Sequence, residues 1–290
     1  MSGRGKRPRR SGDGRSPRDR SARPPAGGRQ GSTGGRRPPR HGLGGDQVEG
    51  RQAVRELLLA GKRPVREVLL LDDLDRSDII DDIEQLANEL GVTVRRVNRK
   101  RLSAEAATTS HQGVMARAAA LTEHELAELM AVDDPFLLVL DGITDPGNLG
   151  AILRTAECAG VTGVVLPRHR SVHVTPTAAK AAAGAIEHLP IAIVGGIPTA
   201  VADLSAAGIL TVGLDAGGQE SLFGPLPGGD GPIALVLGAE GEGLSRLVRQ
   251  RADKVVAIPL QGGLNSLNVA SAAAIACFEV VRRRQDQRAR

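Results

Sequence analysis

The amino-acid sequence predicts an α/β protein in which a parallel sheet is covered by helices on both faces. Two features of the sequence lead to this prediction. Short, continuous apolar runs such as 136–140 and 233–237 have the length of strands and lack the polar alternation of a sheet that faces water. Longer segments with helical spacing of apolar residues separate these runs, as crossover helices separate the strands of a parallel sheet.

Strands and helices are expected to alternate from residue 135 to the end of the chain. The expected strands are 136–140, 164–166, 191–194, 209–214, 233–237 and 255–258. The expected helices are 149–159, 178–185, 199–206 and 244–251, followed by a closing helix. Apolar residues at steps of three and four predict the buried face of that closing helix, and these residues are Leu267, Ala270, Ala274, Phe278 and Val281.

A smaller α/β domain is expected over residues 44–122, ahead of a linker region at 123–134 and the main domain at 135–290. Its expected elements are a helix around 54–58, strand 68–71, helix 77–90, strand 92–97, a short helix near 102–106, the segment 111–118 and a helix over 123–130. A basic cluster in this domain suits an RNA backbone as well as it suits a solvated edge. The cluster consists of Arg95, Arg96, Arg99, Lys100 and Arg101.

Positive charge is concentrated at the N-terminus. Residues 1–43 contain thirteen Lys and Arg against Asp13 and Asp19, whereas the rest of the chain carries a net charge of minus six. The segment is rich in Gly, Pro and Ser, so we expect a disordered tail. Such a tail binds RNA by displacing counterions or serves as a solubilising extension. The chain has no Tyr or Trp, which argues against RNA-binding modules that stack bases on aromatic side chains.

No part of the sequence suggests a membrane span, a signal peptide or a metal site. No apolar run approaches the ~20 residues needed to cross a bilayer, so we expect a cytoplasmic protein. Cys158 and Cys277 lie in helical patterns without CxxC spacing, and we expect both in the core. Asp141 and Asp145 are better explained by turn and capping chemistry than as ligands of a metal.

Three loops follow expected strands, where ligands of parallel sheets bind. The first loop, 141–150, leads to Arg154, which lies opposite the apolar stripe of its helix. The second loop, 238–243, is rich in glycine, which suits a close approach to a ligand as well as an ordinary turn. The third loop, 258–268, places Asn265, Ser266 and Asn268 at the start of the closing helix. Such residues cap helices, and the helix N-terminus also attracts a carboxylate or carbonyl group.

Familiar motifs of other enzyme classes are absent from the sequence. The second loop lacks the Gly-Lys-Ser/Thr of a phosphate-binding loop, and residues 241–246 break the dinucleotide-binding fingerprint at its last position. Ser266 does not lie in a GxSxG sequence, and no HExxH pair occurs. A dinucleotide-dependent enzyme is therefore disfavoured, and hydrolase and zinc-protease functions have no support.

Taken together, the three loops resemble the motifs of the SpoU/TrmH RNA 2′-O-ribose methyltransferases. The matching segments are Asn148-Leu149-Gly150-Ala151-Ile152-Leu153-Arg154-Thr155-Ala156, Leu237-Gly238-Ala239-Glu240-Gly241-Glu242-Gly243, and Ile258-Pro259 followed by Asn265-Ser266-Leu267-Asn268-Val269. Their order and spacing agree with the family over nearly all of residues 133–284. The preceding domain, about 46–122, resembles the L30e-like substrate-binding domain that often precedes the catalytic domain. Within the family the sequence is most similar to bacterial enzymes that methylate a guanosine of large-subunit (23S) rRNA.

The resemblance implies a C-terminal trefoil knot that binds S-adenosylmethionine, and a homodimer that acts on RNA without a metal. The cofactor would lie against Leu214, Gly238, Ile258 and Leu267. Arg154 would activate the ribose 2′-hydroxyl. The ribose, the cofactor and Arg154 would be positioned by Asn148, Glu240, Ser266 and Asn268.

Other RNA-related functions stay open on the sequence. They are a tRNA methyltransferase, an antibiotic-resistance enzyme that methylates an rRNA adenosine, and a non-catalytic RNA-binding or ribosome-assembly protein.

Overall fold

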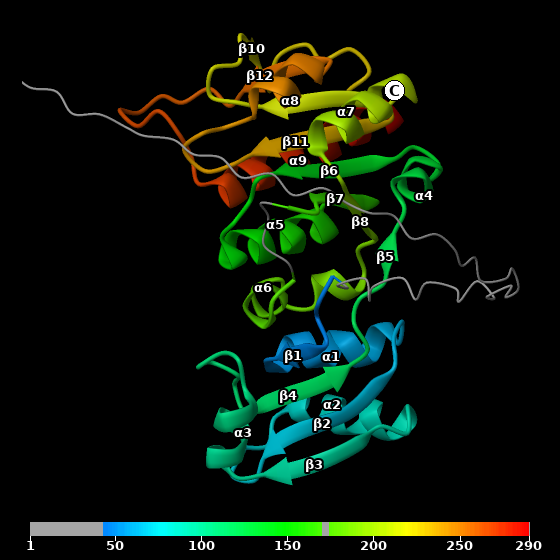
Figure 1. The fold of residues 1–290 in the computed structure, drawn as a ribbon, viewed down its shortest axis with the longest axis vertical. Helices are drawn as coiled ribbons and strands as arrows, with labels where there is room; N and C mark the ends of the chain where they lie inside the picture. The colour runs from blue at the N-terminus through cyan, green and yellow to red at the C-terminus, as the bar shows by residue number, and fades with distance from the viewer. Residues whose placement is uncertain (1–42, 170–173, 290) are drawn as a thin grey trace, which may run out of the picture. The chain divides into compact units, whose positions relative to one another are not determined.

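The computed structural model describes residues 43–169 and 174–289 (Figure 1). Apart from Leu43, the basic tail expected at residues 1–43 lies outside this range. The described part of the chain contains a four-stranded sheet near its N-terminus and an eight-stranded sheet in the remainder. Within the described residues, no helix is long and apolar enough to cross a membrane.

The four-stranded sheet has the order β1-β4-β2-β3. Strand β4 is antiparallel to β1 and β2, whereas β2 and β3 are parallel, so β2 and β3 end at the edge where β4 begins. The strands are β1 (Gln47–Glu49), β2 (Val65–Leu71), β3 (Thr93–Val97) and β4 (Val114–Ala118). The helices are α1 (Arg51–Ala60), α2 (Asp78–Glu89) and α3 (Arg99–Glu105).

All pairings in the eight-stranded sheet are parallel, which confirms the expected sheet type. In spatial order the strands are β10 (Glu220–Ser221), β12 (Lys254–Ala257), β9 (Leu210–Leu214), β11 (Ile233–Gly238), β6 (Phe136–Asp141), β7 (Gly163–Pro167), β8 (Ile191–Val194) and β5 (Glu123–His124). The helical segments are α4 (Leu126–Met130), α5 (Pro146–Cys158), α6 (Pro176–Ala181), the 3-10 turn η1 (Ala185–Glu187), α7 (Ile197–Ala206), α8 (Arg246–Arg251) and α9 (Val269–Arg288).

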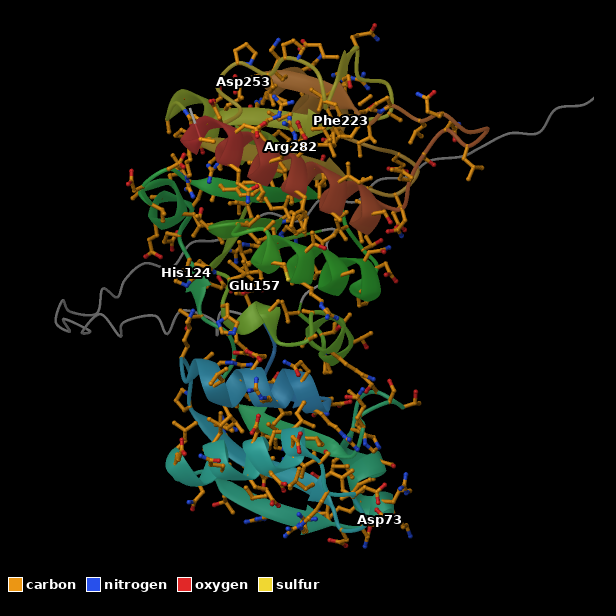
Figure 2. All side chains as sticks on the ribbon, turned by 180° about the vertical axis from the view of Figure 1, so that it is seen from behind. Asp73, His124, Glu157, Phe223, Asp253 and Arg282 are labelled. Atoms are coloured by element: carbon orange, nitrogen blue, oxygen red, sulfur yellow. The ribbon has the colours of Figure 1, made fainter. Side chains whose placement is uncertain are left out.

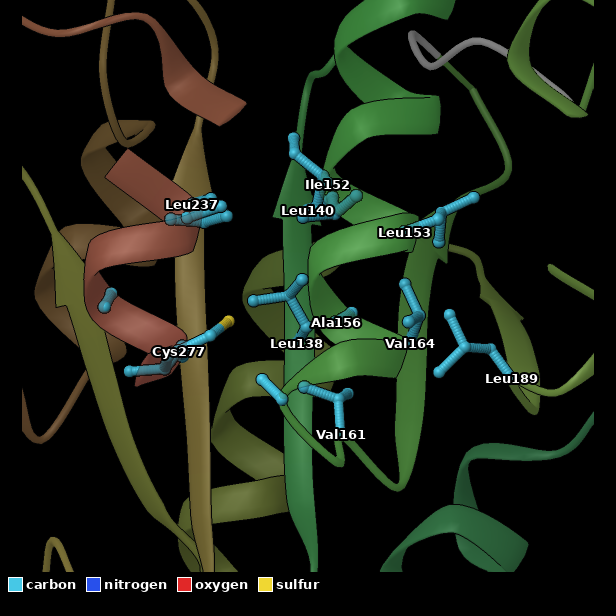
Figure 3. Packing of buried hydrophobic residues seen from close by; sticks show 14 of the residues in the cluster. Leu138, Leu140, Ile152, Leu153, Ala156, Val161, Val164, Leu189, Leu237 and Cys277 are labelled. Atoms are coloured by element: carbon cyan, nitrogen blue, oxygen red, sulfur yellow. The ribbon is translucent and has the colours of Figure 1, made fainter. Parts of the chain in front are cut away.

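Helices cover both faces of this sheet because side chains alternate along its fully buried strands. Along β6, Leu138 and Leu140 belong to the core beneath α5 and α9, whereas Leu137 and Val139 belong to the core beneath α4, α7 and α8. Figure 3 shows Ile152 and Ala156 of α5 next to Leu138 and Leu140. The continuous apolar runs in the sequence thus reflect strands that are buried on two sides.

After β12 the chain does not continue along the edge of the sheet. Strand β12 pairs with β9, yet α9 packs against α5 and β11. Residues 258–268 therefore return across the carboxyl ends of the strands, between the outer strands and the centre of the sheet. The expected C-terminal knot depends on this crossing.

The structure corrects two expected helices. Residues 123–130 do not form a single helix, because 123–124 pair with β8 as strand β5 and only 126–130 are helical. The helix expected at 178–185 ends at Ala181, because Ala183 and Gly184 adopt left-handed backbone conformations with φ of 50° and 91°. A left-handed residue stops the helical hydrogen-bond ladder, and the chain resumes as η1.

Both the buried face of α9 and the environment of one cysteine also differ from expectation. Leu267 precedes the helix, and Leu267 and Phe278 are 42% and 50% exposed. Ala270 and Val281 are partly buried against the core as expected, but the fully buried apolar residues of the helix are Val269, Ala273, Ala276, Cys277 and Val280. Alanine occurs on several sides of α9, so the apolar spacing does not define one face. Cys277 is buried as expected, but Cys158 is exposed.

A buried ion pair joins the segment after α1 to η1. Arg63 Nε lies 2.8 Å from Glu187 Oε2, and Arg63 Nη2 lies 2.6 Å from Glu187 Oε1. Arg63 Nη1 also donates to the backbone carbonyls of Gly45 and Ala119. The two side chains are only 6% and 2% exposed. One guanidinium therefore satisfies acceptors from three separate chain segments, with its charge balanced by a single carboxylate.

We expect Arg63→Met to lower the free energy of unfolding by about 3–5 kcal/mol, because Glu187 would keep a buried charge without a partner. Urea unfolding followed by circular dichroism measures this change. The double variant Arg63→Met/Glu187→Met should lose less than the sum of the two single variants. Arg66→Met is the matched control, since Arg66 is exposed. Equal effects of Arg63→Met and Arg66→Met would contradict the assigned role of the pair.

Candidate functional site

A cavity of about 420 Å³ opens at the carboxyl ends of β9, β11 and β12. The three strands are neighbours in the sheet, so the loops that follow them meet at one edge. Leu214 and Asp215 come from the segment after β9, residues 237–243 from the second loop and the end of its strand, and Ile258 and residues 265–267 from the third loop. The second and third loops are those identified in the sequence, at the sheet edge where ligands of parallel sheets bind.

The second loop folds tightly back on itself at Gly238. A Cβ atom at this position would lie 2.1 Å from the carbonyl carbon of Gly243, so a larger residue cannot be accommodated without moving the backbone. The turn is closed by Gly243 N–H, which donates to the carbonyl of Ala239 at 2.9 Å. Gly241 and Gly243 both have positive φ, which favours glycine there. The second loop thus forms a compact wall of the cavity.

Asp215, directly after β9, fixes the neighbouring loop. Its Oδ1 accepts from Arg249 Nη1 at 2.9 Å and from Gly217 N–H at 2.8 Å. Its Oδ2 accepts from Leu244 N–H at 3.4 Å, just beyond the second loop. Asp215 is a site residue not identified from the sequence, although an acidic residue immediately after a buried strand is a recognisable signal at this edge.

A hydrogen-bonded network connects all three motifs of the sequence. Asn268 Nδ2 donates to Asn148 Oδ1 at 3.0 Å and to Glu240 Oε1 at 3.4 Å, and Asn148 Nδ2 also donates to Glu240 Oε1. Asn268 Oδ1 accepts from the backbone N–H groups of Ala270 and Ser271, so the same side chain caps α9. The Asn148–Glu240–Asn268 network therefore joins the starts of α5 and α9 to the glycine-rich loop.

The first loop is held by the two aspartates that the sequence assigned to turn and capping roles. Asp145 Oδ1 accepts from Asn148 N–H at 2.7 Å, and Pro146 occupies the first turn of α5, where it needs no hydrogen-bond donor. Asp141 Oδ2 accepts from Ser245 N–H at 3.1 Å. Within the residues that the structure describes, no group of His, Cys, Asp and Glu side chains could hold a metal ion.

The structure brings most of the residues identified in the sequence to one place. Six of them line the cavity, and these are Leu214, Gly238, Glu240, Ile258, Ser266 and Leu267. Asn148 and Asn268 adjoin the cavity through Glu240.

Arg154 is the exception, because it lies six residues, about 9 Å, along α5 from Asn148. It is exposed on the outer side of the helix and does not line the cavity. No other residue in the described part of the chain pairs with its guanidinium.

Charged and ionisable groups on α9 anchor the helix rather than serve the cavity. Hydrogen bonds from Arg282 hold the pKa of Glu279 below its ordinary value, despite partial burial of the carboxylate. Arg283 donates to the carbonyls of Leu222 and Gly224, which fixes the segment after β10. Burial raises the pKa of the Cys277 thiol to about 12, so this cysteine is not a thiolate nucleophile at neutral pH.

Both parts of the chain match families of RNA methyltransferases. Residues 135–278 match the SpoU rRNA Methylase family, and residues 47–124 match the family described as RNA 2′-O ribose methyltransferase substrate binding. The chain is 40% identical over 244 residues to the 23S rRNA (guanosine-2′-O-)-methyltransferase RlmB of Shewanella oneidensis, with 83% of this chain and 98% of the relative covered. It is 37% identical to the protein of the same name from Escherichia coli, with 82% and 99% covered.

Solved structures show the same fold. The SpoU methyltransferase AviRb from Streptomyces viridochromogenes, in complex with the cofactor AdoMet, superposes with a TM-score of 0.69 at 26% identity. The match covers 83% of this chain and 90% of AviRb. The similarity therefore extends over both sheets, and it confirms the expected α/β fold class.

The two functions of Asn268 can be separated by mutation. Asn268→Ala removes the cap of α9 and both donor bonds of the network, so we expect a loss of about 1–2 kcal/mol in the free energy of unfolding. Asn268→Asp keeps a good cap but adds a carboxylate beside Glu240. Its deficit should shrink as the salt concentration rises from about 0.05 M to about 1 M, because salt screens the repulsion between two exposed carboxylates.

Urea unfolding of each variant at both salt concentrations measures these effects. Asn265→Asp is the matched control, because it adds the same charge to the same loop outside the network. If Asn268→Asp and Asn265→Asp respond identically to salt, the network does not couple the loops.

Proposed function

The chain belongs to the SpoU family of RNA methyltransferases, and we propose that it transfers the methyl group of S-adenosylmethionine to the ribose 2′-hydroxyl of a guanosine in 23S rRNA. The observation that carries this proposal is the Asn148–Glu240–Asn268 network, which draws the three family motifs to the rim of one cavity. Support for the substrate comes from the relatives that are named as 23S rRNA guanosine methyltransferases and cover most of the chain.

The lining of the cavity fits S-adenosylmethionine. Its volume of about 420 Å³ lies within the usual range of small-molecule sites. Leu214, Ile258 and Leu267 supply apolar surface suited to an adenosine group. Backbone groups near Gly238 lie at the same cavity, where they would hydrogen-bond to the polar atoms of that group. The carboxylates of Glu240 and Glu242 lie at the same cavity, where they favour a cationic ligand.

The chemistry of the reaction defines what the protein residues must do. When bound, S-adenosylmethionine would supply the methyl group of its sulfonium centre: the O–CH₃ bond would form as the S–CH₃ bond breaks, S-adenosylhomocysteine would leave with the bonding pair, and the hydroxyl proton would pass to water. A ribose hydroxyl is a weak nucleophile, so the site must hold the oxygen in line with the methyl group. It must also stabilise negative charge on that oxygen in the transition state.

We assign positioning to the network and charge stabilisation to Arg154. Asn148, Glu240, Ser266 and Asn268 fix the rim at which the ribose would meet the cofactor. Arg154 has a guanidinium that stays protonated at neutral pH, which makes it a poor proton acceptor. Its role is to bind the phosphate next to the target ribose and to stabilise the developing alkoxide.

Arg154→Ala should reduce methyl transfer by roughly 10²- to 10³-fold, because one donor to the developing oxyanion is lost. Binding of S-adenosylmethionine, measured by calorimetry, should be unchanged, since Arg154 does not line the cavity. Transfer of a labelled methyl group to unmodified 23S rRNA measures the rate. Arg251→Ala is the matched control, because it removes an exposed arginine on α8. Near-normal turnover in Arg154→Ala would refute the assignment.

The distance between Arg154 and the cavity supports a homodimer. Helices α5 and α9 pack side by side on one face of the sheet (Figure 2). Their outer surfaces carry Arg154, the exposed Cys158 and Phe278, which is 50% exposed. Phe278 leaves an aromatic ring partly in solvent on this face, and a second subunit packed there would bury it. We infer that a second copy covers this face, and that each site combines the cavity of one copy with Arg154 of the other.

Mixing two inactive variants tests the shared site. Arg154→Ala and Asn268→Ala would each be inactive alone, but a heterodimer would contain one site with neither change. Random pairing makes half of the dimers heterodimers, so the mixture should recover about a quarter of wild-type transfer. A mixture as inactive as its components, with dimers verified by light scattering, would show that both residues act in the same chain.

The remaining expectations follow from this activity. We propose that residues 44–122 bind the RNA, that 123–134 form the linker region and that 135–290 carry catalysis. A cytoplasmic location suits an enzyme that acts on ribosomal RNA. In the basic cluster, Arg95, Arg96, Arg99 and Arg101 each pair with a carboxylate at 2.7–3.6 Å, so the arginines are partly neutralised at this surface.

A further inference from the structure

A second cavity lies in the four-stranded sheet, at the edge where β2 and β3 end and β4 begins. It has a volume of about 590 Å³ and is lined entirely by residues 51–113. The segment after β2, the start of α3, the start of α1 and the segment before β4 form its walls. None of the family motifs in the sequence accounts for this cavity, because all of them belong to the eight-stranded sheet.

The cavity contains a buried histidine with one unused nitrogen. His111 is 8% exposed, and its Nδ1 accepts from Gly113 N–H at 3.0 Å. A neutral ring that accepts at Nδ1 carries its proton at Nε2. In the described part of the chain Nε2 has no hydrogen-bond partner and is not fully buried, so it is open to the cavity that His111 lines. His111 therefore offers a hydrogen-bond donor to a ligand in the cavity.

The walls of the cavity are held in place without a ligand. Gln112 has a φ of 54°, and its Oε1 accepts from Arg51 N–H at 3.0 Å while its carbonyl accepts from Arg51 Nε at 3.2 Å. Glu49 is fully buried and accepts from the backbone N–H groups of Ala107 and Thr108. Burial alone would raise the pKa of Glu49, but these hydrogen bonds together with the Thr108 hydroxyl keep it below the ordinary value. A charged carboxylate thus anchors the segment that carries His111.

The charges of the cavity indicate a nucleobase rather than a simple anion. Two arginines, Arg51 and Arg99, and two carboxylates, Asp73 and Asp75, line it together. Asp73, labelled in Figure 2, lies 3.3 Å from Arg99 Nη2 through its Oδ2. A site for free phosphate would not include two carboxylates, because they repel an anion. Leu71 and Leu74 add an apolar wall against which a flat ring can lie.

The geometry points to an unpaired guanine of the RNA substrate as the occupant of this cavity. Guanine has two adjacent N–H donors on its Watson–Crick edge, which suit a carboxylate such as Asp73, and carbonyl and ring-nitrogen acceptors that suit His111 Nε2–H. Arg51 and Arg99 would meet the phosphates on either side. The inference rests on the proposed RNA substrate and adds to it a second nucleotide, distinct from the methylated one, that is read by the N-terminal domain.

Binding of isolated nucleotides tests the cavity directly. The full chain with ¹⁵N-labelled histidine is titrated with guanosine, GMP, AMP, CMP, UMP and inorganic phosphate, and side-chain spectra are assigned with His111→Gln. GMP and guanosine should shift Nε2 of His111, and the other nucleotides should do so less. A shift caused by phosphate but not by guanosine would reveal an anion site and overturn the inference. Absence of any shift up to millimolar GMP would also overturn it.

Steady-state methyl transfer to 23S rRNA tests the same site in the reaction. Arg99→Ala and Asp73→Asn should raise the KM for RNA roughly tenfold, with little change in kcat, because each removes a base or phosphate contact. Arg95→Ala is the matched control, since Arg95 is an exposed arginine paired with Glu67 outside the cavity. Calorimetry with S-adenosylmethionine checks that the other cavity is intact.

The outcomes separate this inference from the proposed function. Normal transfer with an unchanged KM in Arg99→Ala and Asp73→Asn would refute the guanine site and leave the methyltransferase assignment in place. A wild-type chain that binds S-adenosylmethionine but methylates no RNA would refute the proposed function. In that case the nucleotide titration still decides whether the cavity binds guanine.

Discussion

The candidate active site depends on three hydrogen bonds among two amides and one carboxylate. Each partner of the Asn148–Glu240–Asn268 network comes from a different loop, and these loops lie 92 and 28 residues apart along the chain. Asn268 also caps α9, so the position of that helix and the shape of the rim are set by one side chain. The parallel sheet brings the loops to one edge, and the network fixes their relative positions to within hydrogen-bonding distance.

Much of this arrangement could be predicted from sequence because parallel sheets impose simple rules. Buried strands appear as continuous apolar runs, and loops at their carboxyl ends meet. Six of the nine site residues accordingly line one cavity. The position of Arg154 outside that cavity was not predictable, because helical spacing shows that a residue faces outward but not what it faces. The face of α9 was predicted only in part, since alanines at 270, 272, 273, 274 and 276 make several sides equally apolar.

The features without a sequence signal are those that depend on long-range partners. Neither Arg63 nor Glu187 belongs to a motif, and their pairing spans 124 residues of the chain. The cavity around His111 could not be predicted either, because its walls come from four separate segments and the sequence around the histidine contains no recognisable motif. Strand β5 was not predicted, because its two residues are too few to show the alternation of apolar and polar side chains that indicates a strand. In each case the local sequence is compatible with several environments, and tertiary contacts select one.

The Arg63–Glu187 pair has a consequence for how the two parts of such an enzyme can be exchanged. A buried charge is destabilising unless an oppositely charged group lies next to it, so the two positions can change only together. If residues 44–122 were grafted onto another catalytic domain, Arg63 would face whatever residue occupies the position of Glu187. Its buried charge would then lack a carboxylate partner. A functional chimera must therefore carry both halves of this contact or replace both by apolar residues. The two sheets are separate, but this one pair of side chains restricts which N-terminal and catalytic parts can be combined.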